Sequence, residues 1–218
     1  MLKERKVRKV WLDGDSPAIR HLCAQDKRLG KAISMVGAIE YSVYEDEYEF
    51  LIWQIVGQMI SSQATRKIGG RLEQWCEGRI TLEAIDELTN EDLRRVGLSR
   101  PKISYIRALN DAIRFGELNF EELRSLDDEA ATKKLCSFRG IGAWTASMYL
   151  IFVLDRQDVL AMHDRCFRTV FKWLYDTTDV SPAAIKKRAA KWSPYSSIAV
   201  RYFYRCLDYG FTKAKFEF

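Results

Sequence analysis

The sequence Phe-Arg-Gly-Ile-Gly-Ala-Trp, residues 138–144, constrains the fold more than any other stretch of this chain. Gly140 and Gly142 flank one apolar residue, a pattern that predicts a tight hairpin turn between two helices. Glycine has no Cβ and tolerates positive φ, so backbone amides in such a turn can approach an anion closely. The amide-rich start of the following helix adds positive dipole on the same side. The turn is therefore a candidate phosphate site, although a plain helix cap has the same glycine pattern.

Signals that start helices recur along the chain, whereas the alternation typical of strands is almost absent. Serine followed by proline, at residues 16–17 and again at 181–182, is typical of an N-cap with proline at the first helical position. Thr89 and Asp92 have the spacing of a capping box, with aspartate in place of the usual glutamate. These signals predict an all-α protein.

Two apolar runs predict the main core helices. Apolar residues recur at helical spacing from Ile19 to Ile33, and Gly37 predicts the end of that run. The stretch from Phe50 to Ile60 predicts the most apolar helix, at the centre of the core. A polar interruption at residues 61–63 separates it from the next helix.

Length and charge narrow the class of protein. With 218 residues, 47% of them hydrophobic, the chain can bury a full core as one domain or two small lobes. A net charge of +5 is compatible with a polyanionic partner but does not require one. The longest apolar run, Met148 to Leu154, is far too short to cross a bilayer, so we expect no membrane partner. Met1 to Lys6 has basic residues without an apolar segment behind them, so we expect a solvated N-terminus and no secretory signal.

The cysteines do not have the spacing of a metal site. We expect reduced, mostly buried thiols, no metal and no cofactor. The five are scattered along the chain: Cys23, Cys76, Cys136, Cys166 and Cys206.

The hairpin sequence also resembles that of a known family. Gly-Ile-Gly-Ala-Trp-Thr-Ala at 140–146, followed by an apolar run and then Asp164, resembles the helix-hairpin-helix DNA glycosylase superfamily. Within it, the chain is most similar to the inducible 3-methyladenine DNA glycosylase branch. Three further stretches resemble this branch and occur in its order, at residues 57–61, 96–102 and 192–195.

The resemblance implies a fold. A single glycosylase domain would span residues 1–218 and comprise two helical lobes with a cleft between them. A barrel-like central bundle with the hairpin would occupy residues 45–160. The second lobe would pair residues 1–44 with 161–218, and the damaged base would bind in the cleft, where the hairpin faces the catalytic aspartate. From the length of this sequence we expect no counterpart of the N-terminal β-sheet domain of some members.

The resemblance also implies a reaction. It identifies Asp164 as the catalytic carboxylate of a monofunctional glycosylase of base excision repair, acting on alkylated purines such as 3-methyladenine. A carboxylate beside the sugar would stabilise the positive charge that develops as the base departs, or activate the attacking water. The residue is equally suited to a plain helix N-cap, and both roles are compatible. Trp144 stands where bifunctional relatives have a lysine nucleophile, so we expect no lyase activity.

The base pocket and the intercalating residue follow from the same match. Trp144, Trp53 and Tyr204 are the candidate walls, because aromatic faces attract a cationic base; Trp53 is equally compatible with a core position. Tyr204 stands where the branch has a stacking tryptophan. Met59 is the preferred wedge that fills the gap left by the flipped base, with Gln63 as the alternative and a core position as the structural explanation for Met59.

The hairpin carries the expected phosphate contacts and one departure from the family. Arg139, Gly140, Gly142 and Ala143 are the candidates, and Arg139 stands where the family usually has proline. His163 replaces an acidic or small residue next to the candidate carboxylate. It is either a solvated loop residue or a source of positive charge that depresses the pKa of that carboxylate.

Two alternatives remain open from the sequence. One is a glycosylase of the same fold for uracil, hypoxanthine or mismatched bases. The other is a non-enzymatic module that uses the hairpin only to bind DNA. In the leading interpretation the protein is a monomer inside the cell, associated with the DNA of a nucleoid or nucleus, and its partner is double-stranded DNA containing damaged bases.

Overall fold

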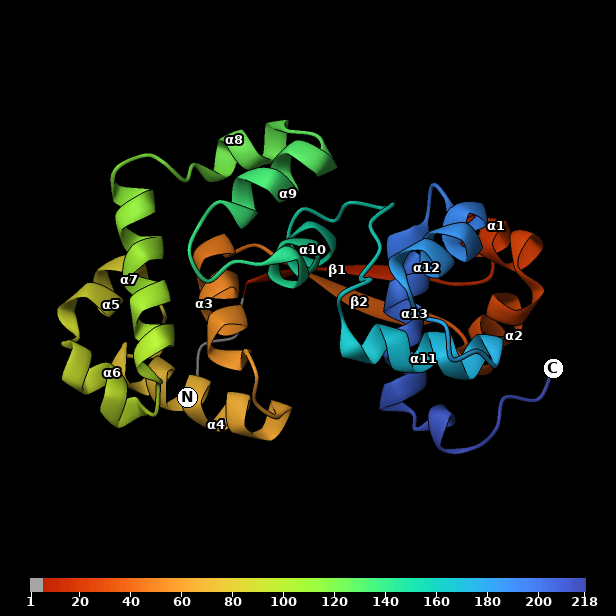
Figure 1. The fold of residues 1–218 in the computed structure, drawn as a ribbon, viewed down its shortest axis with the longest axis horizontal. Helices are drawn as coiled ribbons and strands as arrows, with labels where there is room; N and C mark the ends of the chain where they lie inside the picture. The colour runs from red at the N-terminus through yellow and green to blue at the C-terminus, as the bar shows by residue number, and fades with distance from the viewer. Residues whose placement is uncertain (1–5) are drawn as a thin grey trace. The chain divides into compact units, whose positions relative to one another are not determined.

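The computed structural model describes residues 6–218; most of the expected basic N-terminal segment, residues 1–5, lies outside the described residues. The described chain is mostly helical, with one two-stranded sheet, which confirms the all-α prediction (Figure 1). It forms two compact units. Among the described residues, the first comprises Lys6, Val7 and Tyr44–Tyr149, and the second comprises Arg8–Val43 and Leu150–Phe218.

Helix α3 is the centre of the first unit and packs against α4 and α7 (Figure 1). Its face is entirely buried at Leu51, Ile52, Ile55 and Val56. The helices of this unit are α3 (Glu47–Gly57), α4 (Ser62–Trp75), α5 (Leu82–Glu87), α6 (Asn90–Val96), α7 (Arg100–Arg114), α8 (Phe120–Ser125), α9 (Asp128–Cys136) and the start of α10 (Ala143–Phe152).

Local capping explains where these helices begin and end. The predicted capping box is present in both directions, with Thr89 and Asp92 bonding each other's backbone at the start of α6. Gly97 ends α6 at φ +114°, a conformation that L side chains rarely adopt. Helix α7 begins after Ser99, and Pro101 lies in its first turn.

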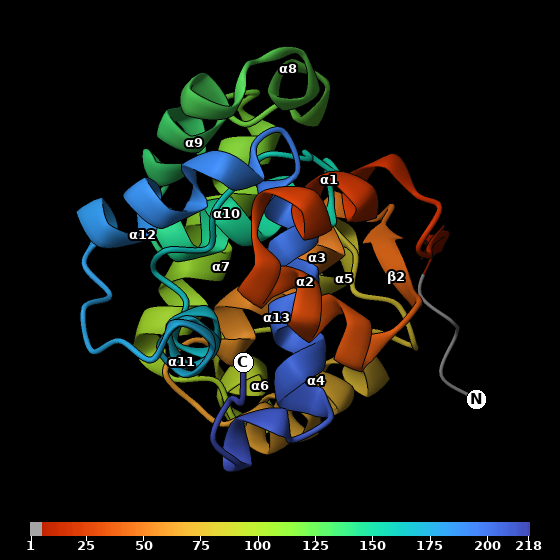
Figure 2. The same cartoon turned by 90° about the vertical axis from the view of Figure 1, so that its right-hand side faces the viewer.

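Helices α2 and α13 form the centre of the second unit, and α13 also packs against α11 (Figure 2). The core here is aromatic, with Trp192, Phe203, Phe167 and Phe171 almost fully buried. Such pairs of rings bury large apolar areas and gain further from their edge and stacked contacts. The elements are β1 (Val7–Leu12), α1 (Pro17–Gln25), α2 (Lys27–Val36), β2 (Ile39–Tyr44), α11 (Arg165–Tyr175), α12 (Pro182–Ala189), the 3₁₀ turn η1 (Ala190–Trp192), α13 (Ser196–Asp208) and the 3₁₀ turn η2 (Phe211–Lys213).

The two strands and one helix break were not expected from the sequence. Strands β1 and β2 pair, and alternate residues of β2 are buried at Ile39, Tyr41 and Val43. The single helix expected from Ile19 to Ile33 is divided in two. Asp26 leaves the helical conformation and accepts hydrogen bonds from the first amides of α2, so it caps a new helix.

The apolar helix expected from Phe50 to Ile60 ends early, at Gly57. Met59 adopts φ +58°, a left-handed conformation that no helix continues through. Ile55 and Val56 are buried, whereas Met59 and Ile60 are exposed. The prediction from hydrophobic character alone was therefore wrong at this end and placed the end of the helix three residues too late.

The thiols are less buried than expected. Cys76 and Cys206 are buried, but Cys136 and Cys166 are exposed, and all five cysteines are free. Among residues 6–218, no three histidine, cysteine, aspartate or glutamate side chains are grouped to hold a metal ion. No helix in the described range has the length and apolar character needed to cross a membrane.

Candidate functional site

The predicted hairpin lies between α9 and α10 in the first unit. Ile141 is buried and anchors the turn, whereas Arg139, Gly142 and Ala143 are exposed. The Gly142 carbonyl accepts the Ala146 amide at 2.9 Å, so the first amides of α10 lie immediately after it. Amides in the first turn of a helix have no acceptor within the helix, which leaves them available to an anion.

The two glycines of the hairpin, Gly140 and Gly142, have different structural roles. Gly140 adopts φ +88°, and a Cβ there would lie 2.3 Å from the Tyr105 ring, so both conformation and space require glycine. A Cβ on Gly142 would meet nothing within 4 Å. Gly140 therefore shapes the turn, and Gly142 keeps its outer surface open. The Arg139 guanidinium lies 5.8 Å from the centre of the same Tyr105 ring.

The turn between α3 and α4 is tied to the hairpin. The Gln58 side chain donates a hydrogen bond of 2.8 Å to the Gly140 carbonyl. Lys102 donates one of 2.8 Å to the Val56 carbonyl at the end of α3, and partial burial lowers the pKa of this amine. The α3 side of the turn is thereby tied to the hairpin and to α7, and its tip, Met59, has its side chain fully exposed.

Met59 and Gln63, the two candidate wedges, are both exposed in the first unit. The exposure of Met59 removes the core explanation for it. Gln63 lies in the first turn of α4, behind Ser61, whose hydroxyl caps that helix. Met59 at the tip of a fixed turn is the better placed of the two, because an apolar side chain held in water gains by entering a base stack.

The two tryptophans lie in different surroundings. Trp144 is half-buried in the first turn of α10. Trp53 lies against Gly69 of α4, where a Cβ would come within 2.1 Å of its ring. The cavity beside Trp53 is about 40 Å³, roughly the space of one water molecule. This packing favours the core interpretation of Trp53, one of the two that the sequence leaves open.

Asp164 caps α11 in the second unit, as its place in the sequence predicts. It accepts the Phe167 amide at 2.8 Å, and 9% of its surface is exposed. The Tyr204 hydroxyl also donates a hydrogen bond to it; burial, followed by the negative charge of Asp164, raises the pKa of Tyr204 well above its ordinary value. The carboxylate is thus held by one amide and one phenol.

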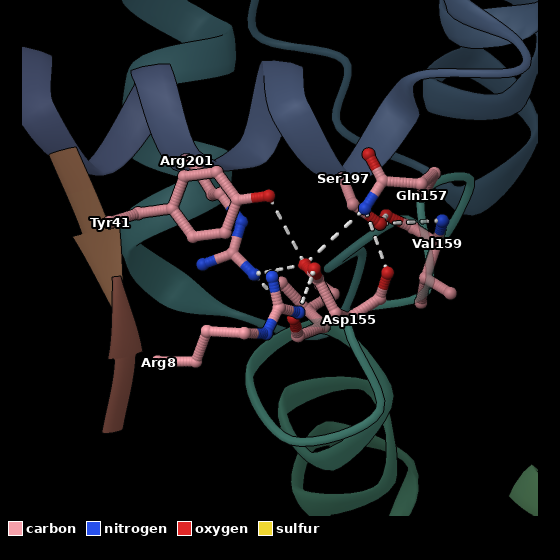
Figure 3. A network of polar contacts seen from close by, with 8 residues as sticks. Arg8, Tyr41, Asp155, Gln157, Val159, Ser197 and Arg201 are labelled. Atoms are coloured by element: carbon pink, nitrogen blue, oxygen red, sulfur yellow. Dashed lines mark hydrogen bonds and ion pairs between the residues drawn. The ribbon is translucent and has the colours of Figure 1, made fainter. Parts of the chain in front are cut away.

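The segment that leads to Asp164 is clamped onto the start of α13 (Figure 3). The Val159 amide donates to the Ser197 hydroxyl at 2.9 Å, and the Ser197 amide donates to the Gln157 carbonyl at 2.9 Å. Asp158 accepts hydrogen bonds from Ser193 and from the Ser196 amide. A loop bonded at successive residues has few conformations, so it fixes the start of α11.

A buried arginine completes this clamp (Figure 3). Arg201 of α13 has 4% of its surface exposed and lies over the Tyr41 ring, 3.7 Å from its centre. It donates to the Ile151 carbonyl at 2.5 Å and pairs with Asp155 at 3.2 Å. Asp155 adopts φ +53° and also binds Arg8 at 2.8 Å. Burial lowers the pKa of Arg201, while Tyr41 and Asp155 raise it.

Arg201 and Tyr204 share one ring as a neighbour. Phe152 lies 4.8 Å below the Arg201 guanidinium and 6.0 Å from the Tyr204 ring. Arg201, Asp155 and the two residues that tie the turn, Gln58 and Lys102, are not among the site residues expected from the sequence. One signal was available: Arg201 is a single charge inside the otherwise apolar stretch from Ile198 to Tyr204.

His163 is exposed on the turn before Asp164. This position favours the solvated loop residue over the alternative, a charge that acts on the carboxylate. Solvent around an exposed imidazole screens its field.

Comparison with known proteins agrees with this architecture. Residues 52–194 match the HhH-GPD superfamily of base excision DNA repair proteins. The crystal structure of a DNA-3-methyladenine glycosidase from Bacillus halodurans has a TM-score of 0.83 and 31% identity, and covers 94% of this chain and 95% of that one. A 3-methyladenine DNA glycosylase of Schizosaccharomyces pombe in complex with abasic DNA has a TM-score of 0.81 and 26% identity, covering 88% of this chain and 97% of that one.

The match extends to curated sequences. DNA-3-methyladenine glycosylase 1 of Schizosaccharomyces pombe is 27% identical over 192 residues, which cover 85% of this chain and 84% of that protein. The family match spans well over half of the chain and includes the turn after α3, the hairpin and Asp164. The chain therefore belongs to the HhH-GPD superfamily of base excision DNA repair proteins.

Proposed function

We propose that this protein is a monofunctional DNA glycosylase that hydrolyses the N-glycosidic bond of alkylated purines such as 3-methyladenine, acting as a monomer on double-stranded DNA. The names of its relatives support this substrate class. The observation that carries the proposal is Asp164, a carboxylate held by the Phe167 amide and the Tyr204 hydroxyl at the end of a clamped loop.

Hydrolysis of the N-glycosidic bond requires one fixed negative charge beside the sugar. As the bond between C1′ and the base nitrogen breaks, the electron pair leaves with the base and positive charge develops on the sugar. Asp164 stabilises that charge or accepts a proton from the attacking water. An alkylated purine already carries positive charge, so it departs without a general acid. One carboxylate is then sufficient.

The roles of the other residues follow the same logic. The hairpin amides and Arg139 hold a phosphate, Met59 enters the stack when the target base is flipped, and Tyr204 and Trp144 provide aromatic faces for a cationic base. Trp144 has no amine, so no Schiff base forms at this position and the abasic strand is left intact.

A base-release assay tests the proposal directly. Purified protein is incubated with duplexes that contain 3-methyladenine, 7-methylguanine, hypoxanthine, uracil or a mismatch, with and without borohydride. We expect release of the methylated purines, no covalent protein–DNA adduct, and strand breakage only after alkali or heat. Release of uracil or hypoxanthine alone would contradict alkylated purines as the substrate class and assign the base that is released instead. A trapped adduct would refute the monofunctional assignment. Binding to DNA without release of any base would indicate a non-enzymatic DNA-binding protein.

A further inference from the structure

A groove of about 660 Å³ lies in the first unit between α6 and α7, next to the hairpin. One face of α7 lines it at intervals of three and four residues, and α6 provides the other side. Its lining residues are Asn90, Glu91, Arg94, Arg100, Ile103, Ser104, Arg107, Ala108, Asp111 and Arg139.

The charges along this groove are unevenly distributed between its two ends. Arg107 and Asn90 share a hydrogen bond of 3.1 Å, so they mark the end of the groove away from the loop that joins α6 to α7. Glu91 and Asp111 are next to these residues along their helices. Arg94 and Arg100 flank the connecting loop at the opposite end. That end is therefore positive.

The cations at the positive end are not neutralised by the protein. Within residues 6–218, the guanidinium groups of Arg94 and Arg100 make no hydrogen bond or ion pair, and both side chains are exposed. Arg139 likewise makes no hydrogen bond or ion pair in the described chain, and its guanidinium lies over the Tyr105 ring. Exposed charges of one sign, close together, attract a polyanion. By contrast, Arg107 is committed to the Ile85 and Leu88 carbonyls.

Arg139 belongs both to this groove and to the hairpin. Tyr105, on which it lies, is five residues after Arg100, about 7.5 Å along the axis of α7. The phosphates of one DNA strand are about 3.4 Å apart along the duplex axis, so this separation corresponds to about two nucleotide steps. A strand held at the hairpin can therefore continue into the groove.

We infer that the positive end of this groove, at Arg94 and Arg100, is a second binding site for DNA backbone phosphates, beyond those at the hairpin. The inference rests on the proposed function and extends it. The groove offers arginines without an aromatic platform for stacked bases, so it contacts the backbone and lengthens the footprint on the duplex without reading sequence.

The test compares arginines of α6 and α7 around the loop that joins these two helices. Arg94→Ala, Arg100→Ala and the double variant are measured for affinity to an abasic duplex across a range of salt concentrations. Arg95→Ala is the control: it removes the same charge one residue away, from a side chain that pairs with Glu91 at 3.7 Å and with Asp92 at 3.9 Å. All three substitutions are on exposed side chains, and thermal unfolding verifies that each variant retains the fold.

Each groove variant should lower the slope of log affinity against log salt by about one counterion, and the double variant by about two. Arg95→Ala should keep the slope of the parent. Parental slopes in both groove variants would overturn the inference and leave an acidic protein segment as the occupant to seek. An equal loss in Arg95→Ala would also overturn it, because net charge alone would explain the effect. Base release by the parent is measured separately, so a failure of the proposed function can be distinguished from a failure of the groove inference.

Discussion

At the scale of single residues, Asp164 combines a structural and a chemical task. Its carboxylate closes the first turn of α11 through the Phe167 amide, and the same group is the candidate for stabilising the departing-base transition state. The two tasks are separable, because asparagine caps helices about as well as aspartate but carries no charge.

Asp164→Asn should therefore keep the fold and lose the reaction. We expect base release to fall by about 100-fold or more, with thermal unfolding and duplex affinity close to those of the parent. Single-turnover release and binding to an abasic duplex measure the two effects. Turnover within about tenfold of the parent would show that the carboxylate is only a cap.

Met59 provides a second test at this scale. Met59→Ala should lower release from duplex DNA by about tenfold or more, because the gap left by the flipped base is no longer filled. Release from single-stranded DNA should change little, and stability should not fall, since the side chain is fully exposed. Gln63→Ala is the matched variant at the alternative position. A larger loss for Gln63→Ala would assign the wedge to α4 instead.

At the scale of elements, the hairpin joins a shaped turn to an open helix start. Gly140 is required by its conformation and by the Tyr105 ring, whereas Gly142 faces open space. The Gln58 side chain donates a hydrogen bond to the Gly140 carbonyl, so the turn that carries Met59 is joined to the hairpin within the first unit.

This difference between the glycines predicts opposite outcomes for their substitution. Gly142→Asp should weaken binding to intact and abasic duplexes alike, because its charge repels phosphate, without lowering the melting temperature. Gly142→Ala is the uncharged control. Gly140→Ala should destabilise the protein by about 1–3 kcal/mol. Arg139→Ala should reduce the salt slope by about one counterion. Parental affinity in Gly142→Asp and Arg139→Ala would mean that the main anchor lies elsewhere.

At the scale of the whole molecule, one buried carboxylate joins distant parts of the second unit. Asp26 is 2% exposed and caps α2 with one oxygen. Its other oxygen accepts hydrogen bonds from Tyr175 at 2.7 Å and Trp192 at 3.1 Å, and pairs with Lys191 at 3.1 Å. Burial alone raises the pKa of Asp26, but these donors outweigh it and lower the pKa below its ordinary value.

The sign of this shift sets the pH range of its contribution. A carboxyl whose pKa is lower in the folded state stabilises the protein above its unfolded pKa of about 3.9, and the contribution is lost as pH falls through the folded value. Asp26→Asn keeps a cap but places an amide against donors. It should lower the free energy of unfolding by about 3 kcal/mol at pH 7.

Below about pH 4 the difference between Asp26→Asn and the parent should shrink, because the unfolded parent then takes up a proton that the folded carboxyl, with its lower pKa, binds less readily. Urea unfolding at pH 7, 5 and 3 measures both effects, and Asp15→Asn, an exposed carboxylate, is the control for charge loss. A constant difference at all three pH values would show that packing around Asp26, and not its charge, stabilises this unit.

The sequence by itself determined the features that depend on neighbouring residues. Each of these features depends on residues within about four positions of one another, the range over which helix geometry and side-chain caps act. They are the hairpin, the capping box of α6, the proline starts of α1 and α12, and the cap at Asp164. The all-α class follows from their repetition, and the family resemblance from their order.

Only the tertiary structure decided the features whose partners are far away in the chain. Asp26 breaks the first helix while it binds Trp192, 166 residues later. The turn that exposes Met59 is held by Lys102 and by the hairpin, and Arg201 is buried because Tyr41, Phe152 and Asp155 surround its charge. The sequence pattern shows where apolar and charged residues recur along the chain. It does not show which distant group compensates for the burial of a charge.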